Sequence, residues 1–141
     1  EHAEAVAAVG GDSAEVRTAR DLLGLDGIVL PGGESTTLGI VAGGSGLLDA
    51  LRAAIAGGLP ALGTCAGMIM LASATTGGPQ PLVGGMDIVV RRNAFGRQPR
   101  SFGAERAVPA LGPGPVDAVF IRARWIERAG PGVEVLATHA G

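Results

Sequence analysis

The sequence predicts an α/β protein of three layers, in which helices cover both faces of a mostly parallel sheet. In the first half, short apolar runs that end in Gly- or Pro-rich turns alternate with amphipathic helical segments, as in doubly wound sheets. In the second half, short strand-like segments follow one another with little helix between them, which predicts extra strands at the sheet edge. The chain has 141 residues, 47% of them hydrophobic. This is enough for one core, so we expect a single domain over residues 1–141.

The chain begins with helical character and then turns to strand. Residues 1–9 carry apolar side chains at near-helical spacing before a Gly-Gly pair, which predicts a helix. Residues 14–17 alternate like a short strand, and residues 18–25 have the character of a loop or a one-turn helix. Residues 27–30 form a compact apolar run that ends at Pro31-Gly32-Gly33. This pattern predicts a buried parallel strand that leads into a functional loop.

Two helical pieces follow, over residues 34–42 and 45–56, with a break at Gly43-Gly44. Ser45 is expected to cap the N-terminus of the second piece, because a serine hydroxyl can accept from a free N–H there. The second piece carries four large apolar residues on one face, as expected of a helix that covers a core. They are Leu47, Leu48, Leu51 and Ile55.

The alternation continues with a strand over residues 59–63 and a helix over residues 65–74. After residue 74 the sequence pattern changes to short strand candidates that are separated by turns rich in Gly and Pro. These candidates are residues 86–90, 101–108, 116–121 and 133–137.

Composition excludes several classes of function. The formal net charge is -2, and no basic cluster goes beyond Arg91-Arg92, so we expect no nucleic-acid or membrane-surface partner. All 11 basic residues are arginines, which excludes a lysine Schiff base or a lysine general base within this chain. The single cysteine cannot form an internal disulfide, no signal segment opens the chain, and no apolar run reaches membrane-spanning length. A cytoplasmic protein is therefore expected.

The most informative segment surrounds this cysteine and has the pattern G-x-C-x-G, from Gly63 to Gly67. A strand leads into it and a helix leaves it, which is the layout of a nucleophile elbow. The flanking residues must be small there, because the strand and helix backbones nearly collide. The helix that begins at Cys65 would help to stabilise a thiolate. The alternative is a buried core cysteine, and the motif alone leaves both interpretations open.

The Pro31-Gly32-Gly33 loop is expected to lie beside this elbow, because the carboxyl ends of successive parallel strands meet at one edge of the sheet. A thiolate that adds to an amide creates an oxyanion, which needs two preset hydrogen-bond donors. The natural donors are the backbone N–H of Ala66 and that of Gly32 or Gly33. Two alternatives stay open: glycines required only for tight turns, or a phosphate-binding loop that lacks the usual lysine.

Five segments in order and spacing resemble one family, the glutaminase subunit of pyridoxal 5'-phosphate synthase. The resemblance implies a fold like that of class I glutamine amidotransferases, which is flavodoxin-like. Other class I enzymes share the Pro-Gly-Gly and G-x-C-x-G elements, but the stretch 93–98 belongs to this subfamily. The five segments are residues 30–37, 63–68, 91–98, 101–102 and 120–123.

The resemblance implies hydrolysis of L-glutamine to glutamate and ammonia through a thioester on Cys65, with no cofactor and no metal. An arginine suits the carboxylate of the glutamine head group, for which Arg92 is the candidate, and Glu34 or backbone carbonyls suit its ammonium. Without the motifs, Arg92 and Arg122 would be interpreted as solvated surface arginines. The family's glutamine contacts correspond to Gly33, Glu34, Ser35, Arg92, Ile121 and Arg122.

The implied partner is the family's barrel-shaped synthase subunit, in a hetero-oligomer. Free ammonia is mostly protonated at neutral pH, and the protonated form is not a nucleophile. Direct transfer of ammonia from one subunit to the other inside a complex avoids its protonation in solution.

The chain departs from the family at both ends. A cysteine glutaminase needs a base, which the family supplies in a His-Pro-Glu segment near its C-terminus. No such segment is present; the 2 histidines are His2 and His139, and no acid follows His139 at the right spacing. The family's first strand, with a Leu-Gln-Gly turn, is also absent before Glu1. We therefore expect an incomplete glutaminase domain that is poorly stable and inactive by itself.

Two other functions remain open at this stage. The chain could be a non-catalytic module that keeps the partner surface and glutamine pocket. It could also be another cysteine hydrolase on a related α/β fold, such as a DJ-1-like protein. Ammonia release from glutamine separates the first alternative from an enzyme, and labelling of Cys65 by 6-diazo-5-oxo-norleucine separates the second.

Overall fold

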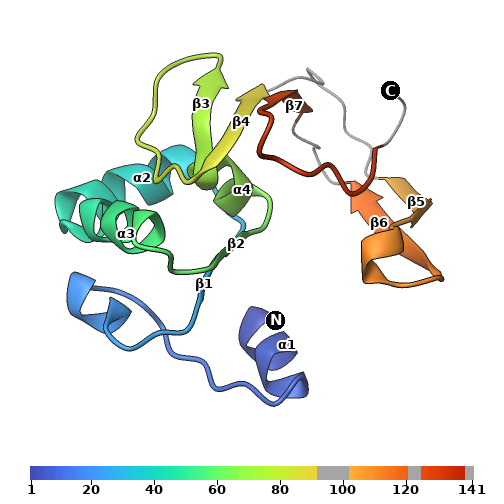
Figure 1. The fold of residues 1–141 in the computed structure, drawn as a ribbon. Coiled ribbons are helices and arrows are strands. Elements are labelled where there is room, and N and C mark those ends of the chain that lie inside the picture. The colour runs from blue at the N-terminus through green and yellow to red at the C-terminus, as the bar shows by residue number, and fades with distance from the viewer. Residues whose placement is uncertain (92–101, 121–124, 139–141) are drawn as a thin grey trace.

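A computed structural model describes residues 1–91, 102–120 and 125–138. Figure 1 shows helices and short strands that alternate through the first half, and a series of strands in the second half. The elements in chain order are α1 (His2–Ala8), the 3-10 turn η1 (Ala19–Leu22), β1 (Ile28–Leu30), α2 (Ser35–Gly44), α3 (Leu47–Ala56), β2 (Ala61–Gly63), α4 (Ala66–Leu71), β3 (Ala72–Thr76), β4 (Met86–Arg91), β5 (Phe102–Ala107), the 3-10 turn η2 (Pro109–Leu111), β6 (Pro115–Phe120) and β7 (Trp125–Ala129).

The described strands form three small sheets. Strands β1 and β2 are parallel, with Leu30 opposite Gly63, and α4 packs against both. Strand β4 lies between β3, to which it is parallel, and β7, to which it is antiparallel. Strands β5 and β6 form an antiparallel hairpin. The predicted α/β class is thus confirmed, with parallel strands in the first half and additional strands in the second.

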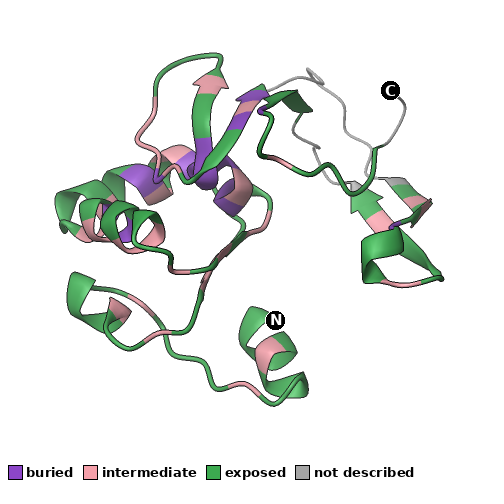
Figure 2. Ribbon diagram, viewed as in Figure 1, coloured by how far each residue is buried: buried purple, intermediate pink, exposed green. Residues whose placement is uncertain are grey.

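The buried residues gather around α4. One cluster contains Leu48 and Leu51 of α3, so the predicted apolar face of this helix is confirmed, together with Met70 of α4. A second cluster contains Ile69 of α4 and Ile88 of β4. Figure 2 shows buried positions concentrated on α2, α3, α4 and the adjoining ends of β3 and β4, whereas α1 and most of the β5–β6 hairpin are exposed. Neighbouring residues of α4 therefore join the two clusters.

The predicted helix over residues 65–74 is too long. The helix α4 ends at Leu71, and the chain continues directly as β3. Ala72 already has the extended dihedrals φ -62 and ψ 150. The Ser73 hydroxyl donates to the backbone oxygen of Ile88 at 2.9 Å, and β3 pairs with β4. Pairing with a distant strand thus overrides the helical pattern.

Two of the predicted strands are wrong. Residues 14–17 and 133–137 belong to no ladder among the described residues. An alternating segment becomes a strand only when another strand pairs with it, and neither segment has such a partner here. Conversely, β7 was not predicted, and it pairs with β4.

The predicted role of Ser45 is also wrong. Helix α3 has Gly46 as its N-cap, and Ser45 is instead the C-cap residue of α2. Its hydroxyl donates to the backbone oxygen of Ala42 at 3.1 Å. Gly46 has φ 74, a left-handed conformation that glycine adopts readily, and this residue turns the chain between the two helices.

An apolar groove with a volume of about 1330 Å³ lies beside β1. Residues 11–17 line one part of it, β1 and β2 line another, and His2 and Val6 of α1 contribute as well. Among the described strands, β1 pairs only with β2.

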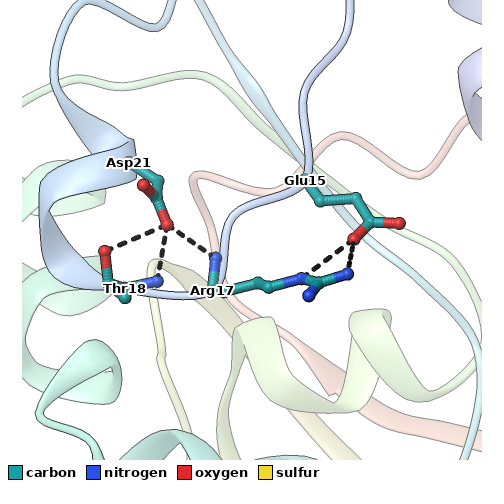
Figure 3. A network of polar contacts seen from close by, with 4 residues as sticks. All are labelled: Glu15, Arg17, Thr18 and Asp21. Atoms are coloured by element: carbon teal, nitrogen blue, oxygen red, sulfur yellow. Dashed lines mark hydrogen bonds and ion pairs between the residues drawn. The ribbon is translucent and has the colours of Figure 1, made fainter.

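A polar network fixes the turn before η1 (Figure 3). The Oδ2 atom of Asp21 accepts hydrogen bonds from the backbone N–H of Arg17 at 3.0 Å and of Thr18 at 2.7 Å, and from the Thr18 hydroxyl at 3.0 Å. The Arg17 N–H bond, followed by those from Thr18, holds the pKa of the Asp21 carboxyl below its ordinary value. The guanidinium of Arg17 donates to Glu15 from Nε at 3.0 Å. These bonds hold residues of one wall of the groove in place.

In the described part of the chain, no single helix is long and apolar enough to cross a membrane. Helices α2 and α3 meet the length and composition criteria only as a pair, with a bend of 100° between them.

Candidate active site

Cys65 lies on a sharp turn between β2 and α4. It has φ 50 and ψ -106, and it is the one non-glycine residue with positive φ in the described part of the chain. Such a conformation costs about 1–3 kcal/mol and persists only where the surrounding structure holds it, commonly at functional sites. The side chain is exposed and its thiol is free. The predicted elbow is confirmed, and the alternative of a buried core cysteine is wrong.

The two glycines of the elbow are required by contact. A Cβ at Gly63 would lie 2.6 Å from backbone atoms of Gly67 and Met68. A Cβ at Gly67 would lie 1.9 Å from the backbone oxygen of Leu30. Backbone cannot give way like the end of a flexible side chain, so both positions need glycine. The expected near-collision of strand and helix is therefore confirmed, and it includes the end of β1.

Backbone hydrogen bonds tie the elbow to its neighbours. The N–H of Thr64 donates to Leu30 at 3.0 Å, and the N–H of Gly67 donates to Thr64 at 2.8 Å. The N–H of Ile69 donates to Cys65 at 3.4 Å. The turn is thus bound to β1 on one side and to the first turn of α4 on the other.

The Pro-Gly-Gly loop lies beside the cysteine, as predicted. A Cβ at Gly32 would be 3.5 Å from the Cβ of Cys65. Gly33 has φ 141, which side-chain-bearing residues rarely adopt. Ala66 is the first residue of α4, so its N–H has no acceptor within the helix. Gly32 and Ala66 thus lie next to Cys65, and the role of Gly32, Gly33 and Ala66 as oxyanion donors stays a prediction.

Glu34 has a structural task that the sequence did not indicate. It is the N-cap of α2, and its carboxylate accepts from the N–H of Thr36 at 3.0 Å and from the N–H and hydroxyl of Thr37 at 2.7 and 2.8 Å. The hydrogen bonds from the hydroxyl and N–H of Thr37, followed by that from Thr36, lower the pKa of Glu34 from 4.5 to about 2. The carboxylate is therefore ionised at neutral pH, which is the state that an ammonium ligand requires.

The hydroxyl of Ser35 points to a residue that sequence reasoning missed. Ser35 is 3% exposed, and its Oγ donates to Oε1 of Gln80 at 3.1 Å. The hydroxyl of Thr36 donates to the same atom at 3.4 Å. The loop that carries Gln80 passes close to α2, since a Cβ at Gly39 would lie 2.7 Å from the backbone oxygen of Pro81. No motif marks Gln80, because only the folded chain brings this loop to α2.

Another contact reaches the elbow from α1. The Nε2 atom of His2 lies 3.0 Å from Oγ1 of Thr64, in a hydrogen bond between residues 62 positions apart. The sequence alone assigned no role to His2, which is one of the two histidines. Three predicted glutamine contacts and the weak candidate base lie outside the described residues. They are Arg92, Ile121, Arg122 and His139.

Within the described ranges, no three His, Cys, Asp or Glu side chains are placed so that they could hold a metal ion.

Comparisons with known proteins agree on one family. The sequence model of the SNO glutamine amidotransferase family matches residues 1–141. The chain is 57% identical over 142 residues to a pyridoxal 5'-phosphate synthase subunit PdxT from a Parafrankia species, with 99% of this chain and 70% of the relative covered. It is 50% identical over 143 residues to the protein of the same name from Streptomyces avermitilis, with 100% and 71% covered. A crystal structure of a glutamine amidotransferase is similar, with a TM-score of 0.88, 46% identity, and 96% of this chain and 72% of that chain covered.

Proposed function

The chain belongs to the SNO glutamine amidotransferase family, and on that premise we propose that it is the glutaminase subunit of a pyridoxal 5'-phosphate synthase. It hydrolyses L-glutamine to glutamate and ammonia. The observation that carries this proposal is the exposed cysteine on a strained elbow, with Gly32 beside it and the N-terminus of α4 behind it. The relatives do not favour a DJ-1-like hydrolase or a module without catalysis.

The reaction begins at Sγ of Cys65. The thiolate adds to the side-chain amide carbon of glutamine, and the tetrahedral oxyanion accepts hydrogen bonds from the N–H of Ala66 and of Gly32 or Gly33. The C–N bond then breaks, the nitrogen takes up a proton and leaves as ammonia, and a thioester remains. Water attacks the thioester, which releases glutamate and returns the thiol. The sum is glutamine plus water to glutamate plus ammonia.

The loop that follows β1 holds the substrate's head group in this proposal. The ionised Glu34 attracts the ammonium, and the backbone of Gly33 and Ser35 supplies further contacts. Ser35 acts through its backbone because its hydroxyl is occupied by Gln80. Arg92, Ile121 and Arg122 are proposed contacts on the strength of the family motifs alone, with Arg92 on the carboxylate.

The ammonia goes to a synthase subunit in a hetero-oligomer. The relatives' name describes a subunit of such a synthase. This chain has no lysine, which supports a separate subunit for the chemistry of the cofactor. We further propose that residues 1–141 form one glutaminase domain and that it works in the cytoplasm, where a single free cysteine stays reduced.

Ammonia release from glutamine tests the proposal. The purified chain is assayed alone and with a synthase subunit, and Cys65→Ala is the control. We expect covalent labelling of Cys65 by 6-diazo-5-oxo-norleucine, and turnover that depends on Cys65 when the synthase subunit is present. Neither labelling nor turnover, in a sample that remains folded, would contradict the glutaminase assignment.

A further inference from the structure

We propose that His2 is a positioning residue for the nucleophile: through the hydroxyl of Thr64 it holds the residue before Cys65 and so keeps the thiol aimed at the Pro-Gly-Gly loop. The inference rests on the proposed function for its consequence in catalysis. The hydrogen bond itself, Nε2 to Oγ1 at 3.0 Å, is a feature of the structure.

Thr64 is held from three directions. Its N–H donates to Leu30 at the end of β1, and its carbonyl accepts from Gly67 in α4. His2, on the first turn of α1, holds the side chain. The backbone contacts come from the elbow's own strand and helix, whereas the contact from α1 comes from a separate element. This third restraint fixes the rotation of the Thr64 side chain, which the two backbone bonds leave open.

The restraint matters because the next residue is strained. Cys65 has φ 50, and a non-glycine residue leaves that region unless its neighbours hold it. Relaxation of φ at Cys65 would change the position of its side chain relative to Gly32, whose added Cβ would be only 3.5 Å from the Cβ of Cys65. A displacement of about 1 Å at a reacting atom can cost a factor of about 100 in rate. A contact one residue away is therefore well placed to affect the reaction.

A role for His2 as the base is not what the geometry indicates. Its ring nitrogen is engaged by Thr64, so it reaches the residue before the nucleophile. Proton transfer requires a hydrogen bond with the reacting group itself, directly or through one water. His2 is thus assigned to positioning.

The test compares His2→Ala and Thr64→Val with the conservative variants His2→Gln and Thr64→Ser. Gln keeps an amide nitrogen near the position of Nε2, and Ser keeps the hydroxyl. Thr75→Val is the matched control, since it removes a threonine hydroxyl that donates to Gly78 at 3.3 Å in an exposed turn. Each variant is assayed for kcat and KM with the synthase subunit present, for the rate of Cys65 alkylation by iodoacetamide, and for its thermal midpoint.

We expect His2→Ala and Thr64→Val each to lower kcat and the alkylation rate about tenfold, with KM unchanged, because one hydrogen bond of ordinary strength is lost. The double variant His2→Ala/Thr64→Val is expected to lose no more than either single one, since both remove the same bond. The two conservative variants are expected to recover most of both rates, and Thr75→Val to match the wild type.

Two results would overturn the inference. The first is unchanged alkylation and kcat in both single variants. The second is additive losses without recovery in the conservative variants, which would mean that the two side chains act separately. Alkylation does not require glutamine, so it tests the inference even if glutamine is not hydrolysed. Absence of glutaminase activity in the wild type, with His2-dependent alkylation retained, would instead contradict the proposed function alone.

Discussion

A side chain added at Gly63 or Gly67 of the elbow would collide with backbone, whereas one added at Gly103 or Gly114 in and around the β5–β6 hairpin would meet nothing within 4 Å. The same residue type therefore has two different meanings in one chain. At the elbow, glycine allows β1, β2 and α4 to approach one another closely enough to strain Cys65. In the hairpin, the space around each of these two glycines would accept a side chain. Glycine content alone thus indicates little, and crowding at each position decides its role.

The largest effect is expected from Gly67→Ala. The new Cβ would lie 1.9 Å from the backbone oxygen of Leu30, so α4 and β1 would have to separate. We expect a loss of about 3 kcal/mol or more in the free energy of unfolding, measured by urea denaturation. Gly103→Ala is the matched control and should change this free energy by no more than about 0.5 kcal/mol. Equal effects in the two variants would abolish the distinction between the crowded and the open region.

A smaller effect on stability is expected at Gln80, whose side chain contacts Ser35 and Thr36 at the start of α2. Gln80→Leu leaves the buried hydroxyl of Ser35 without its acceptor, which costs about 1–3 kcal/mol in the free energy of unfolding. In the double variant Ser35→Ala/Gln80→Leu both partners are gone, so the loss should be smaller than that of Gln80→Leu alone. Denaturant midpoints of the three proteins give the comparison. A double variant that is less stable than Gln80→Leu would argue against this hydrogen bond.

The variant Cys65→Gly is expected to be more stable than the wild type. Glycine has no Cβ and accepts φ 50, so the backbone strain at this position is removed. We expect the free energy of unfolding to rise by about 1 kcal/mol while glutamine hydrolysis is lost. Cys65→Ala keeps the Cβ and should be inactive without the gain in stability. If both variants have the same thermal midpoint, the elbow does not store strain.

The smallest effect concerns acid stability through Glu34. Its pKa is about 2 in the folded chain and returns to about 4.5 on unfolding, so the cap stabilises the folded state above pH 4.5. That contribution is lost as the pH falls from 4.5 toward 2. Glu34→Gln should therefore be less stable than the wild type at pH 6, and the difference should shrink to nothing near pH 2. Thermal midpoints across this pH range measure it, and a constant difference would exclude Glu34 as the titrating group.

The sequence was most informative where structure depends on near neighbours. The G-x-C-x-G spacing predicted the elbow, and the Pro31-Gly32-Gly33 run predicted the loop beside it, because strand-to-helix turns impose their demands within a few residues. The apolar face of α3 was likewise predictable from helical spacing. Predictions failed where a segment needed a distant partner: residues 72–74 are strand because they pair with β4, and residues 14–17 pair with none of the described strands.

By itself, the sequence determined the α/β class, the family and the position of the elbow cysteine, since these follow from local patterns and from the order of motifs along one chain of 141 residues. The tertiary structure alone decided what supports the site. The bonds from His2 to Thr64 and from Ser35 to Gln80 join residues 62 and 45 positions apart. The spacing of residues in the sequence does not predict such contacts, because they form only when packing brings separate elements together.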